Sequence, residues 1–314
     1  MTFNHESTTD QVISGIDLSG KTAVVTGASA GLGIETSRAL AAAGARVVMV
    51  ARDAARLDAA IGAIKETLPK AQLEAQLMDL ADLASVRATA EALLATYPDI
   101  HLLINNAGVM ACPQGLTADG FELQFGTNHL GHFLFTCLLV PALLAAAPAR
   151  VVTLSSAAHR FSDIDFEDPN YQHRDYEKWQ AYGQSKTANA LFSVALNRRL
   201  RDSGVTANAV HPGMIVTELG RHLVQADIDA LQERAAGRTV GFKTIPAGAA
   251  TSVWAATSPQ LETNGGNYLE DCHIGEAVPE GNDGGYSPYA LDEASAERLW
   301  ALSEQLVGQQ FSFG

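Results

Sequence analysis

The sequence predicts a single α/β domain, in which a doubly wound sheet of seven parallel strands carries helices on both faces. The main observation is that short β-branched runs alternate with longer Ala-rich stretches from Lys21 onward, as crossover helices between parallel strands require. A glycine-rich stretch directly follows the first of these runs. The chain of 314 residues is 47% hydrophobic and 18% charged, which supplies material for one large core.

Strands and helices follow from this alternation in chain order. We expect strands at residues 22–26, 46–50, 72–78, 101–104, 150–155, 205–210 and 267–269. We expect helices at residues 32–43, 54–67, 83–96, 121–144, 182–201 and 247–256. The alternation never breaks, so the domain is expected to span residues 20–314 without a second domain.

Three segments lie outside the regular alternation. Residues 1–19 form an N-terminal extension, in which Ser7 with Asp10 could cap a short helix, or which could be a partly ordered chain end. Residues 157–180 and 220–245 have the composition of insertions into the domain. We expect the second insertion to move over a bound substrate.

The net charge of −14 and the pI near 5.0 oppose binding to nucleic acid, because phosphate backbones bind clustered cationic surfaces. Three widely spaced cysteines without a CxxC pair fit reduced thiols in a cytoplasm. The chain start lacks the basic and apolar regions of a signal peptide. The longest apolar run, residues 133–147, is shorter than the roughly 20 residues that cross a bilayer. We therefore expect a cytoplasmic protein without a membrane partner, in which this run is a buried helix.

The glycine-rich stretch after the first strand reads Thr26-Gly27-Ala28-Ser29-Ala30-Gly31-Leu32-Gly33. Glycines at such a strand-to-helix turn let backbone amides approach a pyrophosphate at the positive end of the next helix. The spacing Gly-x3-Gly-x-Gly differs from the GxGxxG of two-domain dehydrogenases. Taken by itself, the stretch could also be a tight turn that binds nothing.

The end of the second strand bears on the choice between NADP(H) and NAD(H). A carboxylate at this point accepts hydrogen bonds from the ribose hydroxyls and would repel a 2′-phosphate. Here Arg52 follows Ala51, and a guanidinium matches a phosphate in charge and in bidentate geometry. NADP(H) is therefore the predicted cofactor. The alternative is that Arg52 is solvated and that Asp53 turns inward to the ribose.

Polar residues also end the next two strands. Asp79-Leu80 closes the third strand, and Asn105-Asn106-Ala107-Gly108 closes the fourth. Small residues at 107 and 108 let the backbone pass close to a ribose. Taken singly, Asp79 could be a helix cap and the asparagine pair a turn. Their order along the chain favours a nucleotide site.

Tyr182 and Lys186 lie four positions apart, so both side chains share one face of a predicted helix. A phenol is a poor acid or base at neutral pH, but an adjacent ammonium and a cationic nicotinamide lower its pKa. Such a pair arises often by chance, and its weight comes from the motifs around it. His129 and His132 have a metal-like spacing, but nothing supplies a third ligand, and we interpret them as ordinary helix residues.

These motifs resemble those of the short-chain dehydrogenase/reductase family, whose members have a Rossmann-type fold: TGxxxGxG, NNAG, YxxxK, and a PGxxxT turn in His211-Pro212-Gly213-Met214-Ile215-Val216-Thr217. The resemblance implies that Asp79 holds the adenine and that Lys186 also holds the nicotinamide ribose. It implies that Asn128 holds a water that relays protons toward the lysine. The implied catalytic serine, which bonds the substrate oxygen, is Ser156, with Ser155 as the runner-up.

The predicted site has a catalytic set and a cofactor-binding set. The catalytic set is Asn128, Ser156, Tyr182 and Lys186. The cofactor-binding set is Gly27, Ser29, Gly31, Leu32, Gly33, Arg52, Asp79, Leu80, Asn106, Ala107, Gly108, Tyr182, Lys186, Pro212, Gly213, Ile215 and Thr217. No metal is expected.

A longer stretch separates Ser156 from Tyr182 than is usual in the family, and it is rich in aromatic residues: Phe161, Phe166, Tyr171, Tyr176 and Trp179. With NHLGHF and HPGMIVTEL, it resembles the branch that contains retinol dehydrogenases, WW-domain oxidoreductases and protochlorophyllide reductases. That branch acts largely on bulky apolar carbonyls or alcohols, which an aromatic-rich loop over the pocket would suit.

We therefore expect an NADP(H)-dependent oxidoreductase that acts on a bulky, largely apolar ketone, aldehyde or alcohol, with Tyr182 as general acid/base. One alternative is reduction of a C=C bond by the same donors. A less favoured alternative is a non-catalytic module that senses NADP(H). Because members of the family are commonly dimers or tetramers, the resemblance implies a homodimer or a homotetramer.

Overall fold

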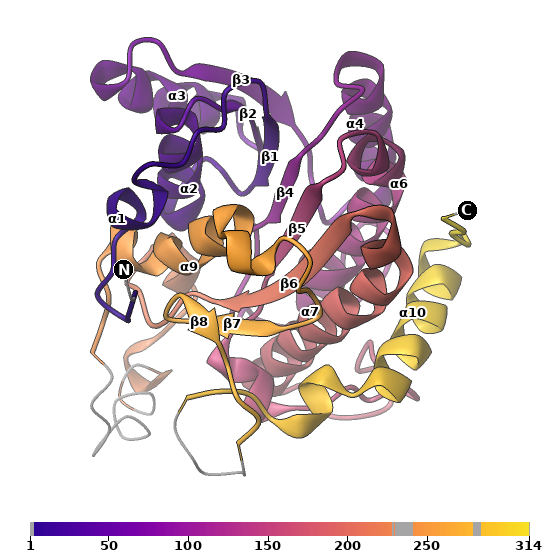
Figure 1. Ribbon diagram of the computed structural model, residues 1–314. Coiled ribbons are helices and arrows are strands. Elements are labelled where there is room, and N and C mark those ends of the chain that lie inside the picture. The colour runs from indigo at the N-terminus through magenta and orange to yellow at the C-terminus, as the bar shows by residue number, and fades with distance from the viewer. Residues whose placement is uncertain (1–2, 228, 230–240, 279–283, 314) are drawn as a thin grey trace.

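The central sheet of this computed structural model has eight strands in the order β3-β2-β1-β4-β5-β6-β7-β8 (Figure 1). The structure describes residues 3–227, 229, 241–278 and 284–313. Neighbouring strands are parallel except the last pair, β7 and β8. The strands are β1 (Thr22–Thr26), β2 (Arg46–Ala51), β3 (Gln72–Leu77), β4 (Leu102–Asn105), β5 (Ala149–Leu154), β6 (Val205–His211), β7 (Tyr268–Glu270) and β8 (His273–Ile274).

The predicted fold class is confirmed, and each of the seven predicted strands lies within one residue of its predicted bounds. The eighth strand was not predicted, because two residues carry no periodicity. It returns antiparallel to β7 through Asp271 and Cys272, which both have positive φ. The strand order reverses between β1 and β4, and parallel sheets bind ligands at the carboxyl ends of the strands on either side of such a point.

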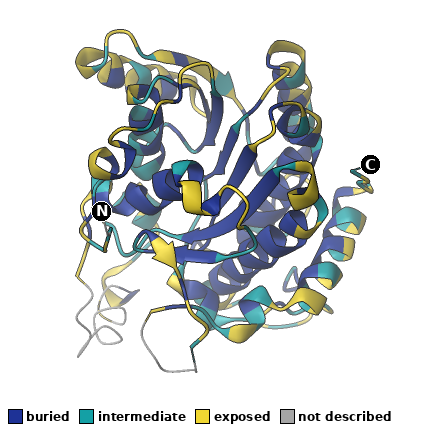
Figure 2. Ribbon diagram, viewed as in Figure 1, coloured by how far each residue is buried: buried dark blue, intermediate teal, exposed yellow. Residues whose placement is uncertain are grey.

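Helices cover both faces of the sheet and enclose two hydrophobic cores (Figure 1). One core lies under α4 (Leu83–Thr96), α6 (Gly131–Ala145), α7 (Lys178–Leu200) and α10 (Glu293–Val307). The other lies under α1 (Thr9–Ile13), α2 (Gly31–Ala42), α3 (Ala54–Thr67) and α9 (Ile245–Thr257). Figure 2 shows buried residues along the strands β1, β2, β4, β5, β6 and β7 and along the inner faces of these helices, whereas β3 and β8 are largely exposed. This arrangement explains why the strands read as nearly continuous apolar runs.

The helix predicted at residues 121–144 is divided into three parts. A short α5 (Leu123–Phe125) leads into a π-helical turn (Gly126–Leu130), and α6 follows. The whole stretch Leu123–Ala145 is long and apolar enough to cross a membrane by length and composition, and 78% of its most apolar window is buried inside the protein. A single π-turn inside a helix often marks a functional position, and this one contains Asn128.

The C-terminal helix α10 was missed by the sequence analysis. Its side chains pack on α7 and α6, and the His129 ring bonds the Ser303 hydroxyl at 2.7 Å. Two features of the sequence, the residues that cap α10 at its two ends, could have predicted this helix. The Asp292 side chain accepts the Ser295 N–H at the start, and Gly308 ends the helix with φ +67°.

The N-terminal extension folds back on the domain. Helix α1 is capped by Thr8, which forms a capping box with Gln11. The proposed Ser7 cap was therefore wrong by one residue. Arg38 of α2 pairs with Asp10 at 2.7 Å. The insertion expected to move over a substrate spans residues 220–245, of which 228 and 230–240 lie outside the described residues.

Candidate active site

The glycine-rich loop forms a cradle at the carboxyl end of β1. A Cβ on Gly27 would lie 2.8 Å from the Ala107 Cα, and a Cβ on Gly33 would overlap the Gly27 carbonyl. The Thr26 hydroxyl accepts the N–H groups of Asn106 at 2.9 Å and Ala107 at 3.0 Å. These bonds join the ends of β1 and β4. Because Gly27 and Gly33 have no side chains, the surface of the loop there is formed by backbone atoms. The cradle therefore fits the pyrophosphate of a dinucleotide.

His132 connects this cradle to the π-turn. Its Nδ1–H donates to the Asn128 carbonyl at 2.9 Å, and its Nε2 lies 2.8 Å from the Thr26 hydroxyl, which donates to it. Burial lowers the pKa of His132 to about 4, so the ring is neutral near pH 7. Within the described ranges no group of three potential metal ligands occurs. His132 is thus more than an ordinary helix residue, since it bonds two predicted site segments.

The side chain of Asn128 is held by neighbours on both sides. Its Oδ1 accepts the Val109 N–H at 2.8 Å, and its Nδ2 donates to the Val109 carbonyl and to the Ser185 hydroxyl, each at 2.9 Å. A Cβ on Gly108 would lie 3.1 Å from Asn128 Oδ1 and 3.6 Å from Lys186 Nζ. The structure therefore brings together three predicted site residues: Lys186, expected to hold the nicotinamide ribose, Asn128, expected in the proton relay toward that lysine, and Gly108 of the cofactor-binding set.

Tyr182 and Lys186 are both buried on α7, which begins one turn earlier than predicted. Lys186 Nζ donates to the Leu154 carbonyl at 3.0 Å and lies 5.6 Å from the Tyr182 ring centroid. Burial lowers the pKa of Lys186 to about 7. Burial raises the pKa of Tyr182 to about 12, although a hydrogen bond with Ser156 lowers it in part. In the chain by itself desolvation outweighs that hydrogen bond, whereas the lowered pKa was predicted for the site with a cationic nicotinamide bound.

The two candidate serines point in different directions. The Ser155 hydroxyl is buried and donates to the Lys186 backbone carbonyl at 2.8 Å. The Ser156 hydroxyl is the one that bonds Tyr182. The segment after Ser156 packs closely on α7 at Gly183, where a Cβ would lie 2.7 Å from the Ala158 carbonyl. The close contact between this segment and the helix that carries Tyr182 therefore requires glycine at position 183. The geometry therefore favours Ser156 over Ser155.

The predicted PGxxxT turn lies against the cradle. Thr217 stands where a Gly31 Cβ would project, at 3.2 Å, and Ile215 packs on Gly248 of α9. Gly213 has φ +93°, and a Cβ there would meet the Lys243 side chain at 2.8 Å. Lys243 was missed by sequence analysis, since nothing near it in the chain marks it.

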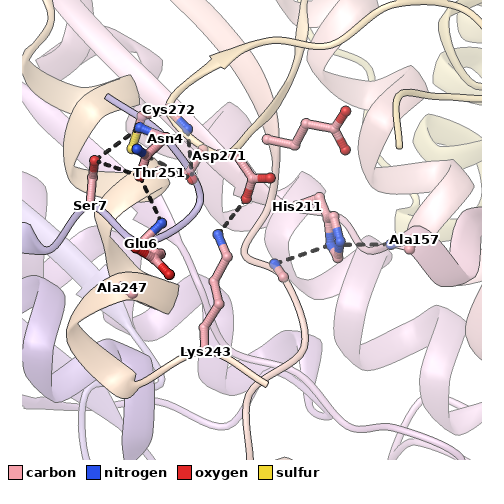
Figure 3. A network of polar contacts seen from close by, with 12 residues as sticks. Asn4, Glu6, Ser7, Ala157, His211, Lys243, Ala247, Thr251, Asp271 and Cys272 are labelled. Atoms are coloured by element: carbon pink, nitrogen blue, oxygen red, sulfur yellow. Dashed lines mark hydrogen bonds and ion pairs between the residues drawn. The ribbon is translucent and has the colours of Figure 1, made fainter. Parts of the chain in front are cut away.

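Lys243 contacts the PGxxxT turn through both its side chain and its backbone. Its Nζ reaches Asp271 at 2.5 Å, its side chain is only 2% exposed, and its backbone N–H donates to the Met214 carbonyl at 2.8 Å. Figure 3 shows Lys243 extended toward Asp271, with His211 nearby. The pair ties the segment before α9 to the hairpin after β7, on either side of the turn.

The residues predicted for the adenosine end of the site follow β2 and β3. Arg52 is exposed, and the Asp53 side chain accepts the Arg56 N–H at 3.1 Å as the N-cap of α3. Asp53 is therefore engaged by its own helix, which disfavours the alternative in which it faces a ribose. The Asp79 side chain accepts the Ala81 N–H at 2.9 Å, and Leu80 packs against Gly131.

The aromatic residues of the insertion divide into three groups. Phe161 contacts Trp179 at a ring distance of 6.0 Å, and Trp179 contacts Tyr182 at 6.4 Å. Tyr171 and Tyr176 pack together away from this chain of rings, and Phe166 packs under the Arg298 guanidinium. Only the first group leads to the candidate catalytic residues.

Comparison with known proteins gives consistent similarities. The family model for short chain dehydrogenases matches residues 21–227. The chain is 43% identical to retinol dehydrogenase 14 of Mus musculus over 302 residues, which cover 92% of this chain and 86% of that protein. It is 40% identical to the WW domain-containing oxidoreductase of Homo sapiens over 316 residues, which cover 98% of this chain and 73% of that protein.

Two solved structures extend this likeness. A crystal structure of an uncharacterised protein from Mycobacterium paratuberculosis is similar with a TM-score of 0.74 and 38% identity, over 96% of this chain and 98% of that one. A short chain dehydrogenase from Burkholderia cenocepacia J2315, solved in complex with NADP, is similar with a TM-score of 0.65 and 26% identity, over 81% and 96%.

Proposed function

Because this chain belongs to the short-chain dehydrogenase family, in the branch of the retinol dehydrogenases and WW domain-containing oxidoreductases, we propose that it uses NADP(H) to interconvert a bulky, largely apolar ketone or aldehyde and its alcohol. The observation that carries the proposal is the meeting of Ser156, Tyr182 and Lys186 beside the glycine cradle. When bound, NADPH supplies the hydride for such a reduction.

The chain's own residues would handle the substrate oxygen. The Ser156 hydroxyl donates a hydrogen bond to that oxygen and stabilises the charge that develops on it. The Tyr182 hydroxyl transfers its proton to the same oxygen. Lys186, with Asn128 behind it, supports the tyrosine electrostatically and holds the ribose. In the chain by itself Tyr182 has a pKa of about 12, so it is protonated near neutral pH and ready to act as an acid.

An apolar substrate is supported by the residues around the catalytic group. Trp179 and Phe161 form the ring contacts that lead to Tyr182. Val216 within the PGxxxT turn and Phe242 beside Lys243 are 74% and 66% exposed. Retinol, named in the relative from Mus musculus, is an alcohol of this kind. Large apolar side chains at a site favour ligands whose apolar surface they can cover.

The proposal is tested by following NADPH oxidation against a panel of ketones and aldehydes of increasing apolar size. We expect kcat/KM to rise with apolar size. No turnover across the panel, despite tight NADPH binding, would favour a cofactor-sensing module. Reduction of a C=C bond remains the second candidate, because the proton and hydride donors would be the same. Product analysis on an enone separates the two, since the proposal expects the allylic alcohol.

Arg52 is expected to distinguish the two cofactors. Replacing Arg52 by Ala should raise the Kd for NADPH by about tenfold to 100-fold, because charge-assisted hydrogen bonds to a 2′-phosphate are lost. The Kd for NADH should change little. Fluorescence titration of both cofactors measures this, with Lys65→Ala, an exposed change on α3, the helix that follows Arg52, as the control. Equal losses for NADPH and NADH would remove Arg52 from the specificity site.

A further inference from the structure

The peptide group that follows Ser156 is held from both sides by histidine rings. The Ser156 carbonyl accepts a hydrogen bond from His159 Nδ1 at 2.7 Å. The N–H of Ala157, at the other end of the same peptide, donates to His211 Nδ1 at 3.2 Å, and Figure 3 shows this bond. Because a peptide group is planar, two bonds on opposite edges fix its orientation.

The bonding partners determine the tautomer of each ring. A carbonyl only accepts, so His159 carries its proton on Nδ1, and its Nε2 accepts the Ser287 N–H at 3.0 Å. His211 Nδ1 accepts from Ala157 and, at 3.4 Å, from the Gly213 N–H, so its proton is on Nε2. Desolvation lowers the pKa of His159 to about 4 and of His211 to about 3. Both rings are therefore neutral near pH 7, in opposite tautomers.

Neighbouring groups restrain the two rings. The fully buried Tyr268 of β7 packs against both, with ring centroids 5.0 Å from His159 and 6.5 Å from His211. The Thr187 hydroxyl, on the helix that carries Tyr182, donates to the His159 carbonyl at 3.0 Å. The His159 contact with Thr187 therefore fixes the position of the peptide after Ser156 relative to α7. The His211 contact with the Gly213 N–H fixes it relative to the PGxxxT turn.

We propose that His159 and His211 are positioning residues, which hold the peptide after Ser156 so that the Ser156 hydroxyl stays against Tyr182. The inference rests on the proposed function, because it concerns the serine that would bond the substrate oxygen. The His159 N–H also donates to the Ser156 carbonyl at 3.0 Å, so loss of either ring removes one of the bonds that orient the peptide. The Ser156 hydroxyl is then held less firmly at the position where both donors reach one oxygen. Because the two rings act here through the peptide rather than on the substrate, we expect the loss to fall on kcat more than on KM.

Substitution of each ring tests the proposal. His159→Leu and His211→Leu are each expected to lower kcat about tenfold, with little change in NADPH affinity. His159→Asn and His211→Asn should recover most of kcat, because an amide placed near Nδ1 can donate at 159 or accept at 211. The control is His101→Leu, which removes a ring that accepts the Thr22 N–H at 3.1 Å at the amino ends of β1 and β4. It should lower Tm without lowering kcat.

A double-mutant cycle separates positioning from general destabilisation. Ser156→Ala should lower kcat about 100-fold, and adding either Leu substitution should lower it no further. Multiplicative losses would overturn the positioning role and leave the proposed function standing. An unchanged kcat in Ser156→Ala would instead contradict the proposed function.

A readout that does not depend on turnover uses the native chain. Nitrogen-15 NMR of the histidine rings should show the proton of His159 on Nδ1 and that of His211 on Nε2, with both rings neutral at pH 7. A reversed tautomer or a protonated ring at either position would overturn the inference, even if the Leu variants failed to fold.

Discussion

Replacing Tyr182 by Phe is expected to lower kcat by about 10³-fold, because the change deletes the group that transfers a proton to the substrate oxygen. The ring itself remains, so its contact with Trp179 and the packing of α7 should persist. The Kd for NADPH should therefore stay within about twofold of the original, since no phosphate contact is altered. Initial-rate kinetics with a bulky ketone and a fluorescence titration measure the two quantities.

Tyr97→Phe is the matched control for this change. The Tyr97 hydroxyl donates to Glu74 at 2.6 Å on an edge strand, away from the candidate site. The control also removes one tyrosine hydroxyl, and it should leave kcat unchanged. If Tyr182→Phe kept its full kcat, Tyr182 would not be the acid, and another donor would have to take that role.

The second large effect is expected for Gly33→Ala. The added Cβ would overlap the Gly27 carbonyl and lie 2.7 Å from Asn106 Nδ2, so the cradle must open. Backbone amides would then lose their hydrogen bonds to the pyrophosphate, each worth about 1.5–3 kcal/mol for a charged acceptor. We expect the Kd for NADPH to rise about 100-fold, which corresponds to about 2.7 kcal/mol.

Gly62→Ala controls for the general effect of adding a methyl group. Gly62 lies within α3, and a Cβ there would meet nothing within 4 Å. Its NADPH affinity should not change, and its Tm should rise slightly because Ala favours helix by about 1 kcal/mol over Gly. A Gly33→Ala variant that binds NADPH as tightly as the original chain would show that the cradle does not hold the pyrophosphate.

Much of the fold could be predicted because its signals are local. The β-branched runs of β1 and β2 and the Ala-rich stretch of α3 identify themselves within a few residues of chain. The parallel sheet follows, because strands joined by helices must cross over in one direction. The π-turn around Asn128 did not follow, since it depends on how α5 and α6 are packed rather than on the residues of the turn.

The candidate site divides in the same way. By itself, the sequence determined the cradle glycines, the Tyr182 and Lys186 pair, and a serine at the end of β5, because turn chemistry and helical spacing act between near neighbours. Only the tertiary structure decided that Ser156 rather than Ser155 meets Tyr182, and that burial raises the pKa of that tyrosine. It also decided that His159 and His211 hold one peptide from two sides. The physical reason is that desolvation and contacts between distant segments depend on how the whole sheet and its helices pack, which no local pattern records.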